Sequence, residues 1–411
     1  MTKMRNNCRI CKGRIITILD FKKVALSGNF LSKNQLNKEK KYSLKTGVCN
    51  KCKHLQIQNI IDPKKLFNHY DWETGISKSN LSLISDLLYE LKKNYKLNKS
   101  SKILEIASND STLLYKFKKE VHCSVLGIDP AKNLSIISKK KNIDTVVDFF
   151  SHRMSVKLKK KYNKFDFCIA RNVVAHTPNP NDIFKGVENI LDKRGIFIIE
   201  VPHLENIYKD NQYDNIFHEH IGFHSVKSII DLCNLNNLKL IDVRKIDSQG
   251  GSIRCFITKK NNSIKIKRNV KSYLDREKKI KIFNLKSWFK FAKRVNKHKK
   301  DLFDYLNMLN IRHKKISGYG ASGKGQSLMQ VCNIGKFLEN IYDKSKIKEG
   351  KYTPGTHIKI IDPKELHSKN DDYLLLLSWN LKNEIAKQEK KFLKGGGKLI
   401  IPFPKPHIFK Y

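Results

Sequence analysis

Lys-Ile-Leu-Glu-Ile-Ala-Ser-Asn-Asp-Ser-Thr-Leu-Leu, residues 102–114, carries the clearest architectural signal in this chain. The apolar run 102–107 predicts a buried strand, and a polar turn leads from it into a helical pattern that begins at Thr112. Apolar runs near 124–128, 165–170 and 195–201 alternate with helix-like segments in the same way. This alternation predicts an α/β fold with a doubly wound parallel sheet. Segments 237–243 and 252–258 are candidates for strands that close it.

The flanking regions differ in character. Residues 1–70 contain cysteines and read as irregular, whereas 78–97 has the apolar spacing of an amphipathic helix. A lysine-rich segment at 260–315 carries a long helical pattern, which we interpret as a connector. A second βα series follows, with strands predicted at 314–319, 339–342, 373–377 and 398–401. The chain therefore combines two doubly wound halves with a cysteine-bearing front piece.

The formal net charge is +44 over 411 residues. This charge alone does not decide which class of anionic partner the protein binds. The lysines are spread along the whole chain, and no aromatic RNA-binding signature accompanies them, so we expect no nucleic-acid partner. An anionic small substrate steered by the same charge fits equally well. No apolar run approaches the length of a membrane span, and the N-terminus lacks the apolar region of a signal peptide. We expect a cytoplasmic protein without a membrane partner, with reduced cysteines.

Two Cys-x-x-Cys pairs predict a metal site. Cys8, Cys11, Cys49 and Cys52 supply four thiolates, the donor set of a tetrahedral structural Zn²⁺ site. All four positions are filled by protein, so no coordination site remains for a reacting water. The alternative is four unrelated thiols. The other cysteines lie in apolar runs and are expected in the core: Cys123, Cys168, Cys233, Cys255 and Cys332.

The turn after strand 102–107 resembles the way class I methyltransferases hold S-adenosylmethionine. Glu105 lies at the strand end, and Asp129 ends the next strand, where an acid can accept both ribose hydroxyls. NAD is disfavoured here because no GxGxxG follows the strand. Ala107 and Ser111 stand where glycines are expected for close backbone approach. The predicted cofactor-binding residues are Glu105, Ala107, Ser108, Asn109, Asp110, Asp129, Pro130, Asp148, Phe149, Phe150 and Arg171.

Histidines and polar residues follow the fourth and fifth predicted strands. Asn172 and His176 come after the fourth strand, Glu200 and His203 after the fifth, and His218-Glu219-His220 somewhat later. Substrates of doubly wound sheets bind outside the carboxyl ends of the strands. A zinc-protease HExxH motif is excluded because no histidine stands three residues after Glu219. A single histidine is usually structural, but a cluster at strand ends favours proton transfer.

A second glycine-rich turn lies between a predicted strand and a helix. Gly318-Tyr-Gly-Ala-Ser-Gly323 satisfies GxGxxG, and Asp343 ends the next strand, which taken alone fits NAD. The turn also approaches a P-loop, but Gly325 replaces the Ser/Thr that would bind Mg²⁺. Backbone N–H groups at the helix start, together with Lys324, suit a diphosphate. A purely structural βα turn is the alternative.

Taken together, the motifs resemble the deoxysugar C-methyltransferase family along nearly the whole chain. In order they are Cys8–Cys11, Cys49-x-x-Cys52-Lys-His54-Leu-Gln56, Leu104-Glu105-Ile106-x-Ser108-Asn109-Asp110, Gly127-x-Asp129-Pro130-Ala131, Ala170-Arg171-Asn172-x-x-Ala175-His176, His218-Glu219-His220, Gly250-Gly251-Ser252-x-Arg254, Gly320-Ala321-Ser322-x-Lys324-Gly325, Lys351-Tyr352-Thr353-Pro354-Gly355-Thr356 and Ser378-Trp379-Asn380.

The resemblance implies a class I methyltransferase sheet, a C-terminal Rossmann-like domain and a small N-terminal zinc-binding domain. The boundaries expected are 1–75 for the zinc-binding domain, 76–260 for the methyltransferase domain, 261–313 for a helical connector and 314–411 for the Rossmann-like domain. Family members methylate C3 of nucleotide-linked 4-keto-deoxysugars, with S-adenosylmethionine as donor. The second histidine of the family's Tyr-His-Glu-His motif, here His220, is the implied base. We expect a monomer.

The resemblance also implies the remaining site residues. The expected catalytic group is His220, His176, Glu219, His218, Asn172 and Tyr70. The expected substrate-binding group is Glu200, His203, Gly250, Gly251, Arg254, Gly320, Ser322, Lys324 and Tyr352. Besides Ala107 and Ser111, the departures from the family pattern are Phe217 for a tyrosine, Gln249 for a histidine and Trp72 for the second aromatic of a Tyr pair.

Three other functions remain open on the sequence. An O- or N-methyltransferase would use the same base on a hydroxyl or amine of another glycan precursor. A silent scaffold would have lost cofactor binding through Ala107 and Ser111. A nicotinamide-dependent oxidoreductase would use the second glycine turn. Cofactor binding separates these from one another.

Overall fold

The central sheet confirms the expected α/β architecture. The computed structural model describes residues 4–70 and 72–410. Its seven-stranded sheet has the order β10-β11-β8-β7-β4-β5-β6. The strands are β4 (Lys102–Ile106), β5 (Ser124–Ile128), β6 (Thr145–Val146), β7 (Phe165–Arg171), β8 (Leu191–Pro202), β10 (Leu238–Ile246) and β11 (Ser252–Lys259). All neighbours are parallel except β11, which runs antiparallel to both β8 and β10. This is the class I methyltransferase topology.

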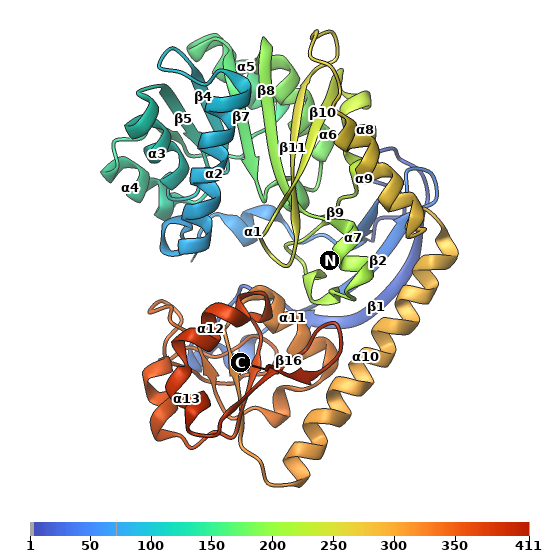
Figure 1. Ribbon diagram of the computed structural model, residues 1–411, viewed down its shortest axis with the longest axis vertical. Coiled ribbons are helices and arrows are strands. Elements are labelled where there is room, and N and C mark those ends of the chain that lie inside the picture. Colours follow the sequence, from blue (N-terminus) through green and yellow to red (C-terminus); the bar gives the residue numbers. More distant parts are fainter. Residues whose placement is uncertain (1–3, 71, 411) are drawn as a thin grey trace.

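Helices cover both faces of this sheet (Figure 1). Successive strand residues point to opposite faces, so Ile103 packs under α2 (Lys78–Tyr95) and α3 (Thr112–Val121), whereas Leu104 packs on the other side. That second face is covered by α5 (His152–Tyr162), α6 (Pro180–Ile190), α8 (Val226–Leu235) and α9 (Arg268–Lys279), whereas α4 (Lys132–Lys140) is tied to the start of α3 through Ser138 and Ser111. The five cysteines expected in the core are all buried.

The N-terminal region is more regular than the sequence indicated. Residues expected to be irregular form an antiparallel sheet in the order β1-β2-β3-β9, from β1 (Ile15–Ala25), β2 (Lys41–Cys49), β3 (Leu55–Ile57) and β9 (Gly222–Phe223). The β1–β2 register shifts twice, between Thr17 and Leu19 and between Asp20 and Lys23. Such bulges interrupt the apolar–polar alternation by which a strand is recognised in a sequence. The last strand, β9, comes from the middle of the chain.

The C-terminal sheet is Rossmann-like, as expected. Its order is β14-β13-β12-β15-β16-β17, from β12 (Ile316–Tyr319), β13 (Ile341–Tyr342), β14 (Ile360–Ile361), β15 (Tyr373–Leu376), β16 (Lys398–Ile401) and β17 (His407–Ile408). All pairs are parallel except β16–β17. In chain order the parallel strands read 3-2-1-4-5, the pattern of a dinucleotide-binding half. Its helices are α11 (Gly323–Cys332), α12 (Lys382–Gln388) and α13 (Lys390–Lys394).

The connector consists of two helices with different partners. α9 packs on the central sheet, and α10 (Leu285–Ile311) runs along the molecule to the C-terminal sheet (Figure 1). Side chains of β1, β2, α10 and α11 share one core cluster, which includes Phe21, Leu44, Trp288 and Leu328. The short helix α7 (Leu204–Lys209) contributes Leu204 and Ile207 to the same cluster, and the short helix α1 (Pro63–Phe67) lies between the N-terminal sheet and α2 in the chain. Across the described ranges, no helix has both the length and the apolar character needed to span a bilayer.

Candidate functional site

The carboxyl ends of β4, β5 and β6 form the edge at which the cofactor residues were expected. Glu105, Asp129 and Asp148 lie at or just after these three adjacent parallel strands. Glu105 Oε2 and Ser108 Oγ are buried and have no hydrogen-bond partner among the described residues. Burial raises the pKa of both Glu105 and Asp129. A ligand with a positive charge and hydroxyl groups would satisfy these atoms, which fits S-adenosylmethionine.

The turn between β4 and α3 has unusual backbone angles, and side chains of neighbouring elements fix its conformation. Ala107, Asn109 and Ser111 have φ of 55°, 53° and 55°. This is the left-handed region, where glycine is favoured. The Asn109 amide N–H donates to Asp129 Oδ2 over 2.8 Å, so the turn is tied to the end of β5. Ser111 Oγ lies 2.7 Å from Ser138 Oγ, which ties the turn to α4.

Residues 72–76 cover this turn, and we call them the covering segment. Thr74 N–H donates to Asn109 Oδ1 over 2.8 Å, and Gly75 N–H donates to Asp110 Oδ2 over 3.0 Å. Asn109 Nδ2 in turn donates to the Trp72 carbonyl. The Trp72 side chain itself is 44% exposed. Asn109 and Asp110 therefore hold this segment over the turn.

Aromatic side chains join the cofactor edge to the histidines. The Phe67 ring lies 5.9 Å from both Tyr70 and His176. Burial, with Glu219 and Asp129 nearby, raises the pKa of Tyr70, which keeps its hydroxyl protonated. The position of Tyr70 is fixed by Asn133, which exchanges two hydrogen bonds with its backbone. At the far end of the edge, the half-buried Phe150 packs against α6 near Gly186.

His220 lies at the centre of the histidine cluster. Its ring centroid is 4.8 Å from His176 in an edge-on arrangement and 4.2 Å from Phe217. His220 Nδ1 lies 2.9 Å from the Asn215 carbonyl, so the proton is on Nδ1 and Nε2 carries the free lone pair. Burial, then the positive fields of His176 and Lys324, holds the pKa of His220 well below its usual range. His220 is therefore a neutral imidazole with an available acceptor nitrogen.

The neighbours of His220 in sequence face different ways. Burial raises the pKa of Glu219 to about 7, and a Cβ added at Gly28 would lie 2.5 Å from Glu219 Oε1. His218 points into the N-terminal sheet, with Nε2 3.1 Å from the Ser43 carbonyl. Burial lowers the pKa of His176 to about 4. His176 thus packs against His220, the Glu219 carboxyl faces Gly28, and His218 anchors the segment to β2.

Four of the expected ligands are held by ion pairs instead. Arg254 donates from Nε to Glu200 over 2.8 Å and from Nη1 to Asp86 over 2.7 Å, and Arg171 Nε also donates to Glu200 over 3.0 Å. This network attaches α2 to the ends of β7 and β8. His203 Nε2 lies 2.8 Å from Glu277 Oε1 and is 2% exposed. Because its other ring nitrogen faces Glu205, the contacts of His203 do not support a substrate-binding role.

The second glycine turn lies against the loop that contains Gln249. Lys324 Nζ donates to the Gln249 carbonyl and lies 5.8 Å from the Trp379 ring centroid. Trp379 Nε1 donates to Asp214 over 2.7 Å, and burial lowers the pKa of Lys324. Gly250 and Gly251 have φ of 87° and 111° in the same loop. Lys324 is thereby brought near His220, which the sequence order did not indicate.

The remaining expected substrate residues shape the C-terminal domain. Ser322 caps α11 by accepting from Gly325 N–H, and Gly320 has φ of 91°. Tyr352 exchanges two backbone hydrogen bonds with Leu31, which joins the C-terminal domain to the N-terminal region. Asp343 Oδ2 accepts from Ala321 N–H over 2.7 Å. Asp343 therefore makes the same contact to its glycine turn that Asp129 makes to the β4–α3 turn.

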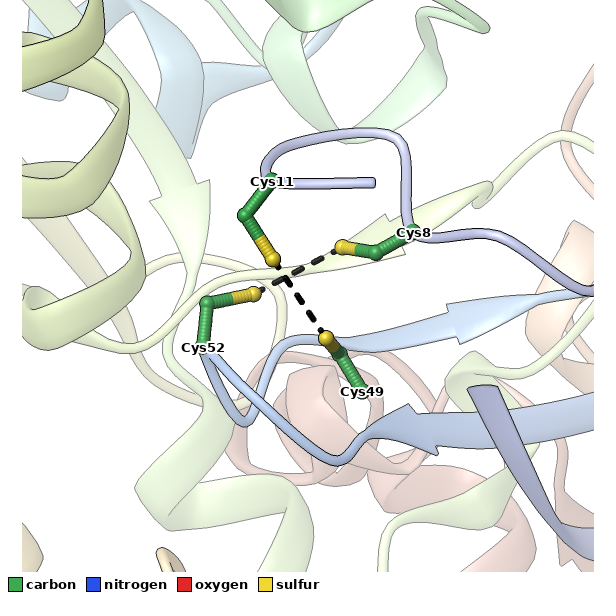
Figure 2. Close-up of side chains that lie close together, drawn as sticks. All are labelled: Cys8, Cys11, Cys49 and Cys52. Carbon is green, nitrogen blue, oxygen red and sulfur yellow. Dashed lines mark hydrogen bonds between the residues drawn. The ribbon is translucent and has the colours of Figure 1, made fainter. Parts of the chain in front are cut away.

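The four expected cysteines meet in space (Figure 2). Their sulfur atoms all lie within 4.8 Å of one another, with Cys8–Cys52 and Cys11–Cys49 separations of 3.5 Å. A tetrahedral Zn–S₄ site has sulfur–sulfur distances of about 3.8 Å, so the cluster fits the ion. Backbone N–H groups of Ile10 and Lys51 point at Cys8 and Cys49. Such donors favour thiolates.

Two side chains, Arg9 and Gln56, form consecutive hydrogen bonds that end at this cysteine cluster. Arg9 donates through both its backbone N–H and Nη1 to Gln56 Oε1 over 3.0 Å. Because the amide oxygen is occupied, Gln56 Nε2 faces Cys8 Sγ, 3.1 Å away. The buried guanidinium carries positive charge beside a cluster of thiolates. Arg9 is 1% exposed.

Comparisons with known proteins agree with this geometry. Three protein-family models match in order: a zinc binding domain at residues 8–67, a methyltransferase domain at 78–243 and a C-methyltransferase C-terminal domain at 247–404. The C-methyltransferase NovU of Streptomyces niveus is 28% identical over 406 residues, covering 98% of this chain and 96% of the relative. The chain is therefore similar to C-methyltransferases along nearly its whole length. It is a methyltransferase that uses S-adenosylmethionine and carries a zinc-binding N-terminal domain.

Two solved methyltransferase structures match less than half of this chain. The magnesium protoporphyrin IX methyltransferase of Synechocystis with bound SAM is 10% identical, with a TM-score of 0.34, and the match covers 43% of this chain and 78% of that one. A SAM-dependent methyltransferase of Thermotoga maritima is 16% identical, with a TM-score of 0.33, covering 44% and 92%.

Several residues of the site carry no motif signal. Asn215 acts through its backbone carbonyl, which any residue would supply. Glu277 lies in the lysine-rich connector, 74 positions from the His203 that it contacts. Asp214 contacts Trp379 across 165 positions. The position of these acids in the sequence does not indicate which side chains they contact, so the contacts are visible only in the tertiary structure.

Proposed function

We propose that this enzyme methylates a carbon next to the ketone of a nucleotide-linked keto-sugar. The main support is His220, a buried neutral imidazole whose Nδ1 is held by Asn215 and whose Nε2 is free to accept a proton. His176, which packs against His220, follows the carboxyl end of β7, the strand beside β4. NovU is named a C-methyltransferase, which agrees with carbon as the acceptor.

The chemistry assigned to His220 is abstraction of a proton. A ketone acidifies the neighbouring C–H, and His220 Nε2 takes that proton, which leaves an enolate. The enolate carbon forms the new C–C bond as the S–CH₃ bond breaks. When bound, S-adenosylmethionine supplies the electrophilic methyl group. His220 then returns its proton to solvent, which restores the base.

The surrounding residues suit an anionic substrate. Lys324 is buried, lies near His220 and brings positive charge from the C-terminal domain. It can bind the diphosphate of a nucleotide-sugar or stabilise the enolate oxygen. Phe217 packs on His220 without offering a hydroxyl, so the polar contact of the ring among the described residues is the one that its Nδ1 makes with the Asn215 carbonyl.

Substitution of the base tests this proposal. We expect His220→Ala to reduce turnover of a nucleotide keto-sugar by at least about a hundredfold, the low end of general-base contributions. Cofactor affinity, measured by calorimetry, should stay within about threefold, because the cofactor residues lie on β4, β5 and β6. His218→Ala is the matched control, since that ring faces the N-terminal sheet. Normal turnover by His220→Ala would exclude His220 as the base.

A further inference from the structure

Gln326, on α11, is a buried amide with nothing to bind. Its side chain is 0% exposed, and neither Nε2 nor Oε1 has a hydrogen-bond partner among the described residues. A buried amide without partners is costly, because the group gives up its hydrogen bonds to water. Both of its ends are unsatisfied, so a ligand would have to offer a donor and an acceptor together.

The helix face that carries Gln326 points toward residues 216–220, the catalytic segment, which contains His220. Residues three and four apart share a face of a helix, so Gly323, Gln326, Ser327 and Gln330 lie together. A Cβ at Gly323 would lie 3.3 Å from the Phe217 ring, and Ser327 Oγ donates to the Ile216 carbonyl over 2.8 Å. Phe217 packs on His220. This face of α11 therefore packs beside the segment that carries the base.

The other border of this face is the end of β1. Gln330 Oε1 accepts from Ala25 N–H over 2.7 Å, and its Nε2 donates to the Ala25 carbonyl. Three residues further along the chain, Gly28 lies against the Glu219 carboxylate. Gln326 lies one turn before Gln330 on α11, between the contacts made by Gly323 and those made by Gln330. It thus lies on a helix face bordered on one side by the contact to Phe217 and on the other by the contact to Ala25.

We propose that Gln326 binds the sugar ring of the nucleotide-sugar, with its amide oxygen accepting from a hydroxyl and its amide nitrogen donating to a sugar oxygen. This inference rests on the proposed function. The sugar is the relevant part because His220 must reach the reacting carbon, and Phe217 contacts both the His220 ring and the face of α11 that carries Gln326. Vicinal sugar oxygens supply the donor and acceptor that the amide requires.

Substitution of Gln326 by methionine distinguishes a role in substrate binding from a role in stabilising the fold. Gln326→Met keeps the side-chain length but removes the unsatisfied amide. We expect the midpoint of thermal unfolding of the ligand-free enzyme to rise by roughly 2–4 °C. We expect the KM for dTDP-4-keto-6-deoxyglucose to rise at least about tenfold, with a smaller change in kcat. The inhibition constant of free dTDP, which lacks the sugar, should stay within about twofold.

Gln330→Met is the matched control one turn along the helix. Its amide is satisfied by Ala25, so this variant should lower the unfolding midpoint and leave the KM unchanged. A lower midpoint for Gln326→Met would assign Gln326 a structural role and overturn the inference. So would an unchanged KM. Failure of the wild-type enzyme to bind any nucleotide keto-sugar would overturn the proposed function instead, and the unfolding midpoints would still show whether Gln326 is unsatisfied.

Discussion

Burial acts in opposite directions on the two titratable neighbours Glu219 and His220. A buried site disfavours charge, so the pKa of the carboxyl rises to about 7 while the pKa of the imidazole falls well below 6.5. At neutral pH the His220 imidazole is therefore uncharged, with Nε2 unprotonated, and Glu219 is divided between its protonated and ionised forms. The base is ready to act without a partner that deprotonates it.

The raised pKa of Glu219 predicts a pH-dependent cost to stability. Its folded pKa lies above the unfolded value, so the carboxyl favours folding fully below about pH 4.5, and that contribution is lost as the pH rises toward 7. We expect Glu219→Gln to raise the urea midpoint relative to wild type at pH 8 and to leave it nearly unchanged at pH 4.5. Glu339→Gln, at an exposed position, should show no such dependence. An equal effect of Glu219→Gln at both pH values would contradict the buried, proton-retaining carboxyl.

The β4–α3 turn shows how an element can keep its geometry after losing its glycines. Ala107 and Ser111 adopt φ of 55° without the freedom of glycine. A left-handed backbone costs a residue with a Cβ roughly 1–2 kcal/mol. The turn persists because Asp129, Ser138 and the covering segment all bond to it.

Restoring glycine should therefore stabilise this turn. We expect Ala107→Gly to increase the unfolding free energy by up to about 1 kcal/mol, since relief of the left-handed strain exceeds the entropy that glycine adds. Ala131→Gly is the control, because Ala131 has φ of −77° and gains nothing from glycine. Urea unfolding monitored in the methyltransferase domain measures both. Destabilisation of equal size in both variants would show that the Ala107 backbone is unstrained.

Sequence patterns predicted the elements whose apolar runs are continuous and missed those whose runs are interrupted. β4, β5 and β7 follow from such runs, and Cys8, Cys11, Cys49 and Cys52 follow from their spacing. β1 was missed because its bulges break the alternation of apolar and polar residues. β9 was missed because a strand of two residues is too short to show such an alternation. His203 and Arg254 were expected at a ligand because they stand in or near motifs. Their acidic partners, Glu277 and Asp86, lie in other helices and become visible only in the fold.

At the scale of the whole molecule, the zinc-binding domain and the catalytic segment share one sheet. β3 pairs with β9 through Leu55↔Phe223 and Gln56↔Gly222, and β9 begins two residues after His220. Gln56 also faces Cys8, so a single short strand contacts both the metal centre and the strand beside the base. The zinc site thereby supports the position of the proposed base from a distance.

Metal removal should accordingly affect more than the N-terminal domain. We expect about one zinc per chain by elemental analysis. Chelation should lower the thermal midpoint and the turnover together, because structural zinc binding contributes folding free energy. Cofactor affinity should change less, since β4 and β5 lie in another sheet. Cys49→Ser should reproduce the effect of chelation, whereas Cys123→Ser, in the core away from the centre, should not change metal content. Metal-free protein with unchanged turnover would separate the zinc site from the active site.

The central claim is methyl transfer to carbon, and the structure of the product tests it most directly. The wild-type enzyme would be supplied with ¹³C-methyl-labelled S-adenosylmethionine and a panel of nucleotide keto-sugars, and the product would be examined by NMR. We predict a labelled methyl group bonded to the sugar carbon next to the ketone. A labelled methyl ether, or no transfer to any member of the panel, would contradict the account.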